Sequence, residues 1–159
     1  MFRGVEELPA PIGEPAPGFD LPDQNGNRVS LRDLRGRRSL VVFVPFPFTD
    51  VCCAELTAVR DDYAALLALD AAVVAITCDT RFANRRWAEE NGFQFPVLSD
   101  FWPHGETCRR YGCFNEASGA AARFSFILDR ERLVRAIVRS DRPSEARDYE
   151  ACKQALIDI

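Results

Sequence analysis

Residues 39–67 read SLVVFVPFPFTDVCCAELTAVRDDYAALL, and they carry the strongest secondary-structure pattern of the chain. Its first part, 39–46, is an almost continuous apolar run with β-branched valines, a pattern typical of a central strand covered on both faces. Apolar residues then recur at helical spacing, which predicts a helix with one buried face. The residues expected on that face are Cys52, Leu56, Val59, Tyr63, Leu66 and Leu67. The stretch therefore predicts a strand that leads directly into a helix, with a thiol in the first helical turn.

The segments around this stretch continue the alternation of strands and helices. Residues 19–31 predict a β-hairpin around the turn 25–27 (NGN), because Asn and Gly tolerate positive φ, and residues 31–36 predict a short helical turn. The further elements that we expect are strands at 72–78 and 95–98, helices at 80–91 and 105–111, a hairpin of 123–128 with 133–138, and a last helix from 143 to the end. This order predicts an α/β chain with a thioredoxin-like fold, in which helices flank a central sheet and a β-hairpin precedes it.

Length and composition restrict the class of protein. The 159 residues are 47% hydrophobic and 28% charged, which fits one globular domain over 1–159, with 1–15 as an extended N-terminal segment. The net charge of -4 argues against binding of nucleic acid or of an anionic membrane surface. No apolar run is long enough to span a membrane, and the first residues lack the apolar stretch of a secretory signal. We therefore expect a cytoplasmic protein whose six cysteines are mostly reduced.

The junction between the strand and the helix carries the reactive chemistry. Cys52 falls in the first helical turn, where free N–H groups and the helix dipole stabilise a thiolate, the nucleophilic form of cysteine. Thr49 lies three residues earlier, so its hydroxyl can reach the same pocket, and Pro45 stiffens and shields the loop. A fixed positive charge would complete the site. Arg123 begins a strand whose alternation places its side chain opposite the phenylalanines of that strand, which are expected to face the core.

Pro45, Thr49 and Cys52 form the motif P-x-x-x-(T/S)-x-x-C, which resembles the active site of peroxiredoxins. The resemblance covers nearly the whole chain. Further segments that carry it are 15–21 (PAPGFDL), 23–26 (DQNG) and 123–129 (RFSFILD). Two more segments are similar to the one-cysteine alkyl hydroperoxide reductase E group known from mycobacteria: 98–105 (LSDFWPHG) and 111–116 (YGCFNE).

The resemblance implies a thiol peroxidase that reduces hydrogen peroxide, organic hydroperoxides or peroxynitrite. It makes Cys52 the peroxidatic cysteine, which becomes a sulfenic acid. Thr49 and Arg123 bind the peroxide and hold the thiolate, and Pro45 shields it. The family alternates between a folded and a locally unwound site and commonly forms homodimers. The expected reductant is a thiol or a redoxin, namely thioredoxin, mycoredoxin or a low-molecular-weight thiol, and no cofactor or metal is expected.

The remaining cysteines leave the step that resolves the sulfenic acid open. Thr57 stands where some peroxiredoxins carry a resolving cysteine, so reduction by an external thiol is the preferred prediction. Cys108 and Cys113, on either side of Tyr111, are alternatives if a loop moves. Cys53 is turned away from its neighbour by helical spacing and would react only after local unwinding. Two further cysteines are expected to pack in the core: Cys78 and Cys152.

Two other functions could use the same reactive thiol. A thiol-disulfide oxidoreductase would normally have a second cysteine three positions after the first, where Glu55 stands. A redox sensor or holdase would react with peroxide stoichiometrically instead of turning over.

His104, the single histidine, is interpreted as structural or interfacial, because a Cys-His hydrolase or a zinc site would need further partners nearby. Phe101, Trp102 and Phe114 are expected to form either an apolar collar, a dimer surface or ordinary core.

Overall fold

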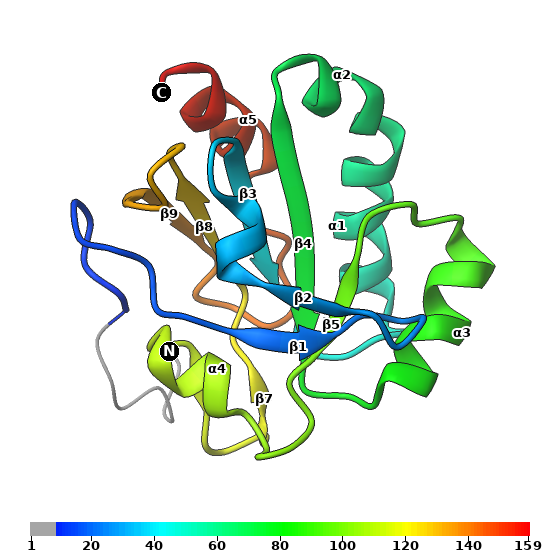
Figure 1. Cartoon of the computed structure of the whole chain (residues 1–159). Coiled ribbons are helices and arrows are strands. Elements are labelled where there is room, and N and C mark those ends of the chain that lie inside the picture. Colours follow the sequence, from blue (N-terminus) through cyan, green and yellow to red (C-terminus); the bar gives the residue numbers. More distant parts are fainter. Residues whose placement is uncertain (1–8) are drawn as a thin grey trace.

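The computed structural model describes residues 9–159, so residues 1–8 of the expected N-terminal segment lie outside the described part of the chain. Helices cover both sides of a central sheet (Figure 1). The strands are β1 (Asp20–Pro22), β2 (Arg28–Ser30), β3 (Arg38–Phe43), β4 (Ala71–Thr77), β5 (Val97–Ser99), β6 (Phe114–Asn115), β7 (Ala120–Ala121), β8 (Phe124–Leu128) and β9 (Val134–Arg139). The helices are the 3-10 turn η1 (Leu31–Leu34) and α1 (Asp50–Asp61), α2 (Tyr63–Ala68), α3 (Arg81–Asn91), α4 (Glu106–Arg110) and α5 (Tyr149–Ile157).

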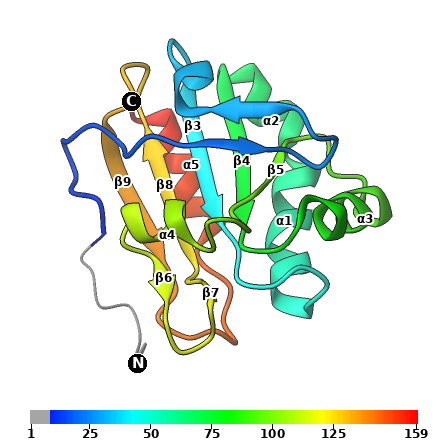
Figure 2. The ribbon, with the colours of Figure 1, turned by 60° about the horizontal axis from the view of Figure 1, so that its bottom comes forward.

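The central sheet has five strands in the order β5-β4-β3-β8-β9. Strands β3, β4 and β5 run parallel, and β8 and β9 continue the sheet in antiparallel pairing. Both faces of the interior strands β3 and β4 are covered. This explains why their sequences are continuously apolar. The predicted N-terminal hairpin forms as β1 paired with β2, and it lies across the strands of the sheet (Figure 2). The predicted thioredoxin-like arrangement is confirmed.

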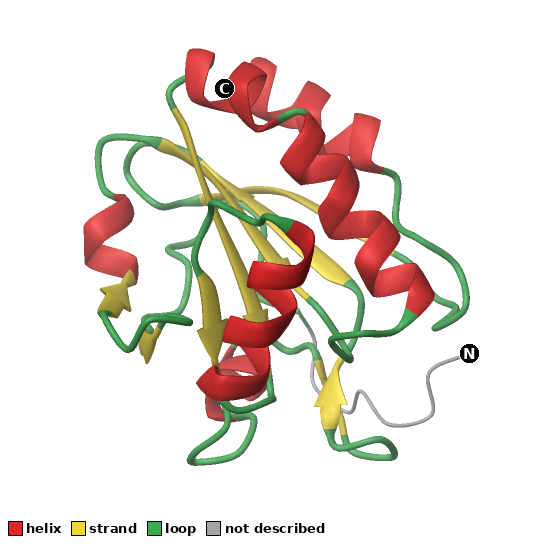
Figure 3. Ribbon diagram, turned by 90° about the vertical axis from the view of Figure 1, so that its right-hand side faces the viewer, coloured by secondary structure: helices red, strands yellow, loops and turns green. Residues whose placement is uncertain are grey.

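The sheet separates two hydrophobic cores, and this separation decides which side chains can meet. Alternate residues of each strand point to opposite faces. On one face, Val42 and Ile127 pack with helices α1, α3 and α5. On the other face, Phe43 and Phe126 pack with α4, η1 and the N-terminal hairpin. Figure 3 shows α1 and α4 on opposite sides of the sheet.

Helix ends follow the sequence signals in the clearest case, α3. The Thr80 hydroxyl caps its start by accepting a hydrogen bond from the Ala83 N–H at 3.3 Å. Gly92 ends it with a φ of 67°, the left-handed conformation that glycine adopts without strain.

Within residues 9–159, no helix is both long and apolar enough to cross a membrane.

Three expectations about the elements were wrong. The last helix begins at Tyr149, because residues 143–148 run as an irregular segment held by tertiary hydrogen bonds to Arg123 and Glu55. Leu67 is 47% exposed, because the chain interrupts the helix at Asp62 and so changes the phase of its apolar stripe. The short β6–β7 hairpin was not expected at all. Each of these depends on contacts that local periodicity does not contain.

Candidate active site

Cys52 lies in the first turn of α1, and its side chain is fully buried. Thr49 is the residue that caps this helix, with extended backbone angles, and its carbonyl accepts the Cys53 N–H at 2.9 Å. Phe48 precedes the cap with a φ of 69°, an uncommon value for a residue with a bulky side chain. The loop between β3 and α1 therefore turns sharply and places the sulfur at the helix N-terminus, as the sequence predicted.

Arg123 meets Cys52 directly. Its Nη1 donates to the Cys52 Sγ at 3.1 Å, although 70 residues separate the two in the chain. The meeting follows from strand alternation, because Arg123 precedes β8 and points to the same face as Ser125 and Ile127, the face that α1 covers. The guanidinium is 4% exposed, and its Nε donates to the Pro143 carbonyl at 2.9 Å. The side chain of Arg123 points away from the phenylalanines of its strand, as predicted. The face of the sheet that it reaches is also covered by a hydrophobic core.

A buried carboxylate, which the sequence analysis did not include in the site, holds this guanidinium. Glu55 Oε1 accepts from Arg123 Nη1 at 2.5 Å and from Arg147 Nη2 at 3.0 Å. Glu55 Oε2 accepts from the backbone N and from the Nε of Arg147, at 2.9 and 2.7 Å. All three side chains are less than a tenth exposed. The signal that could have found Glu55 is its position: it shares the apolar face of α1 with Cys52 and Leu56, where a charge requires a buried partner.

The two arginines determine the charge state of Glu55. Burial by itself would raise the pKa of this carboxyl, but the hydrogen bonds and charge of Arg147, together with the charge of Arg123, outweigh burial and lower the pKa. Glu55 is therefore ionised at neutral pH. Its negative charge compensates one of two buried guanidinium groups, which leaves the other positive charge beside the sulfur of Cys52.

A pocket of about 270 Å³ lies beside Arg123, the residue that contacts the buried sulfur, but Cys52 itself does not line it. Thr49, Pro45 and Arg123 all line it, so the structure brings the predicted site residues together. The Thr49 hydroxyl donates to the Phe46 carbonyl at 2.8 Å, which leaves its oxygen lone pairs free toward the pocket. The remaining lining is mainly apolar surface and comes from the loop after β3, the first turn of α1, the β6–β7 hairpin and the segment before α5: Phe46, Asp50, Val51, Asn115, Ser118, Ala121 and Pro143.

The other cysteines lie apart from Cys52. The Cys53 thiol accepts a hydrogen bond from the Trp87 indole N–H at 3.0 Å, so it faces α3, as helical spacing predicted. Cys108 and Cys113 belong to the core on the opposite face of the sheet. Two further cysteines are buried as expected: Cys78 in that same core, and Cys152 on the α1 face, where burial raises its pKa to about 11. No cysteine pair among the described residues is joined in a disulfide.

The His104 ring lies edge-on to the rings of Phe101 and Phe114, with centroid distances of 6.1 and 5.9 Å. The His104 ring nitrogens lie 3.2 Å from the Phe101 carbonyl and 2.6 Å from the Gly119 carbonyl, so the ring links two loops. Phe114 is buried against Gly105, where an added Cβ would collide with its ring. Phe101 and Trp102 are 47% and 81% exposed. His104 is therefore structural here, and the three aromatic side chains do not form one collar.

A thiol at the start of a helix, on a thioredoxin-like sheet and beside a buried arginine, defines a thiol-based oxidoreductase. Comparison with known proteins narrows this class. Residues 12–137 match the model of the AhpC/TSA family. The chain is 41% identical over 146 residues to alkyl hydroperoxide reductase E of Mycobacterium tuberculosis, covering 91% of this chain and 95% of the relative. It is 33% identical over 127 residues to the peroxiredoxin Bcp of Escherichia coli, covering 76% and 80%.

Solved structures agree with the sequence relatives. The crystal structure of peroxidoxin BcpB from Mycobacterium tuberculosis superposes with a TM-score of 0.82 at 25% identity, over 93% of this chain and 97% of that one. The AhpC structure from Enterococcus faecalis superposes with a TM-score of 0.81 at 29% identity, over 99% and 92%. The chain belongs to the AhpC/TSA family and is a peroxiredoxin, an oxidoreductase that reduces peroxides with a thiol. This confirms the resemblance to peroxiredoxins and to the alkyl hydroperoxide reductase E group.

Proposed function

We propose that Cys52 is the peroxidatic cysteine of this peroxidase and that Arg123, Thr49 and Pro45 form its site. The observation that carries the proposal is the distance of 3.1 Å between Arg123 Nη1 and the Cys52 sulfur, which lies in the first turn of a helix, while Arg123 also lines a pocket. A guanidinium and free helical N–H groups both favour a thiolate over a thiol. Thr49 offers its hydroxyl oxygen to the peroxide, and Pro45 shields the sulfur from water.

The proposed reaction transfers one oxygen atom to sulfur. The Cys52 thiolate attacks the terminal oxygen of a hydroperoxide, so an S–O bond forms while the O–O bond breaks. The leaving oxygen departs as an alkoxide or hydroxide, which Arg123 stabilises before it takes up a proton and leaves as alcohol or water. A first thiol then condenses with the sulfenic acid to a mixed disulfide and water, and a second thiol restores Cys52. In total, one peroxide and two thiols yield one alcohol, one water and one disulfide.

The pocket favours organic hydroperoxides among the substrates we propose, which also include hydrogen peroxide and peroxynitrite. Its lining is mainly apolar, with Phe46, Val51 and Pro143 around the polar groups of Arg123 and Thr49. An alkyl chain on the peroxide would therefore displace water from apolar surface and gain binding energy. The names of the mycobacterial relatives, which are alkyl hydroperoxide reductases, agree with this preference.

We propose that an external thiol, thioredoxin or mycoredoxin reduces the oxidised Cys52. Two observations support this over an internal disulfide. Cys108 and Cys113 lie in the core on the opposite face of the sheet from Cys52. The Cys53 thiol faces away toward Trp87. Mass spectrometry after one equivalent of peroxide tests the point: a sulfenic acid on Cys52 agrees with external reduction, whereas a disulfide from Cys52 to any of the other three would refute it.

The Cys52→Ser variant tests the assignment of the peroxidatic residue. Peroxide consumption with a thiol reductant should fall to the uncatalysed rate, because a hydroxyl at this position is not ionised at neutral pH. The matched control is Cys152→Ser, which removes a second buried thiol on the same face and should leave turnover intact. Turnover by the Cys52→Ser variant, or its loss only in the control, would show that another thiol performs the reaction.

The assembly and compartment of the protein follow as further parts of the proposal. We propose one domain over residues 1–159, since both cores share one sheet. We propose a homodimer, supported by the exposed aromatic side chains of Phe46, Phe48 and Trp102. Light scattering of the purified protein checks this state, and a monomer at micromolar concentration would refute it.

We propose a cytoplasmic location, in keeping with cysteines that are all free.

A further inference from the structure

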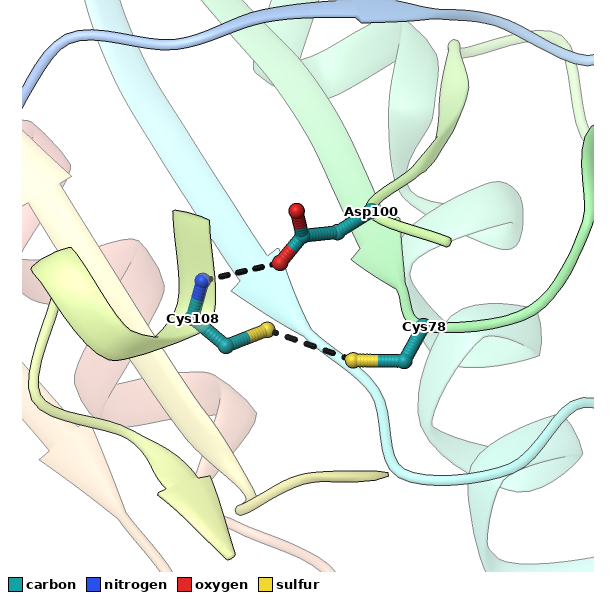
Figure 4. A group of neighbouring side chains, drawn as sticks. All are labelled: Cys78, Asp100 and Cys108. Atoms are coloured by element: carbon teal, nitrogen blue, oxygen red, sulfur yellow. Dashed lines mark hydrogen bonds between the residues drawn. The ribbon is translucent and has the colours of Figure 1, made fainter. Parts of the chain in front are cut away.

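A second cluster of reactive side chains lies on the face of the sheet opposite Cys52. Cys78 follows the end of β4, Asp100 follows the end of β5, and Cys108 lies in α4 (Figure 4). Their sulfur and carboxylate oxygen atoms all lie within 4.8 Å of one another, and all three residues are at most 5% exposed. Since the carboxyl ends of parallel strands meet at one edge of a sheet, the fold itself brings the first two together.

The distance between the two sulfurs fits metal coordination better than a covalent bond. The two thiols are hydrogen-bonded, with the Cys78 Sγ 3.6 Å from the Cys108 Sγ. Two thiolates bound to one tetrahedral Zn²⁺ at the usual Zn–S length would lie about 3.8 Å apart. A disulfide would require a separation of about 2.0 Å, so the sulfurs would have to approach by well over 1 Å inside a packed core.

Asp100 supplies an independent reason to expect a cation. Its carboxylate accepts the backbone N–H groups of Thr107 at 3.1 Å and Cys108 at 2.9 Å, but in the described part of the chain it forms no ion pair. Glu55, the buried carboxylate of the active site, is held by two arginines. A buried carboxylate without a counter-ion is costly.

Cys113 offers a fourth ligand. It follows Cys108 with four residues between them, a spacing found in zinc sites. The chain turns back between the two cysteines: Gly112 takes a φ of 69°, and the Cys113 N–H donates to the Cys108 carbonyl at 2.9 Å. The Cys113 Sγ is not among the atoms that lie within 4.8 Å of one another, so it would reach the ion by a turn of its side chain.

We propose that Cys78, Cys108 and Asp100, with Cys113 as the fourth ligand, bind a structural divalent d¹⁰ cation of the Zn²⁺ type. Each bound thiol releases its proton to solvent, and no electron transfer takes place. The site has three thiols and a carboxylate, a mixed sulfur and oxygen set that a borderline-soft ion accepts. It ties α4 to the ends of β4 and β5, and it is independent of the proposed peroxidase chemistry because the sheet lies between them.

Zinc titration of the full, reduced chain, first stripped of metal with a chelator, tests the proposal. Competition with a chromophoric chelator should show one Zn²⁺ per chain with a sub-micromolar Kd. Cys78→Ser and Asp100→Asn should each weaken binding by more than about 100-fold, since changes outside the ligand shell already cost 10- to 100-fold. The matched controls are Cys52→Ser and Cys152→Ser, which remove thiols on the other face and should bind as the wild type does.

A measurement on the unaltered chain covers the case in which a ligand variant fails to fold. X-ray absorption of the zinc-loaded wild type should show two or three sulfur neighbours and at least one oxygen neighbour. Co²⁺ in place of Zn²⁺ should give thiolate-to-metal charge-transfer absorption. The proposal is overturned by a chain that binds no Zn²⁺ at micromolar concentration, by a site with one sulfur or none, or by binding that disappears in Cys52→Ser. A disulfide between Cys78 and Cys108 in metal-free protein purified without reductant would overturn it too.

Discussion

Replacing Glu55 by Gln should destabilise the folded chain, because this carboxylate is the shared partner of two buried guanidinium groups. Its two oxygens accept one hydrogen bond from Arg123 and three from Arg147. The amide of Gln has nearly the same shape, but its NH₂ group would face an N–H donor, and its charge is zero. Two buried positive charges would then have no anion between them.

The size of the effect follows from the burial of the ion pairs. Removing one partner of a buried pair typically costs about 3–5 kcal/mol. Because the amide oxygen of Gln can still accept hydrogen bonds, we expect the lower end, about 3 kcal/mol at neutral pH. For a chain of this size such a loss lowers the Tm by about 6–12 °C. Urea denaturation gives the free energy, and calorimetry gives the Tm.

The pH dependence provides a sharper test of the same reasoning. Since the folded-state pKa of Glu55 is lowered, its stabilisation is fully present above the unfolded value of about 4.3 and is lost as the pH falls through the folded value. The difference in unfolding free energy between wild type and Glu55→Gln should therefore be largest at neutral pH. It should shrink as the pH falls below about 4, where protonation gives the wild-type residue no charge either.

An exposed carboxylate is the matched control. Glu89 pairs with Arg85 on the surface of α3, and both side chains are 57% exposed. Glu89→Gln should change the stability by less than about 0.5 kcal/mol, because water screens an exposed pair of this kind. The reasoning is refuted if Glu55→Gln is as stable as Glu89→Gln, or if the deficit of the Glu55 variant does not change between neutral and acid pH.

Two further changes test other parts of the structure. Arg123→Lys should lower kcat/KM for peroxide about 10²- to 10³-fold with the fold intact, because one ammonium cannot reproduce the geometry in which Nη1 contacts both Glu55 and Cys52. Stopped-flow kinetics measures this, and an unchanged rate would remove Arg123 from the mechanism. Thr80→Ala should cost about 1 kcal/mol in urea denaturation, since it removes the acceptor for the Ala83 N–H. An unchanged midpoint would show that this cap does not contribute to stability.

Much of the site was predictable because it is local in sequence. Pro45, Thr49 and Cys52 lie within eight residues, so the spacing of the motif already brings them to one turn. The orientation of Arg123 also followed from the alternation of its strand. Its contact with Cys52 was expected only from the resemblance to peroxiredoxins, because that contact requires β3 and β8 to be neighbours in the sheet, and their pairing is decided by tertiary packing.

Periodicity and a short motif were enough to predict the strand-to-helix junction, the reactive thiol and the class of fold. Which buried side chains meet depends on tertiary packing. Arg147 reaches Glu55 from 92 positions away, and Cys78 approaches Cys108 from the end of a different strand. Such meetings depend on how the sheet and helices pack, and a linear pattern of polar and apolar residues does not specify that geometry.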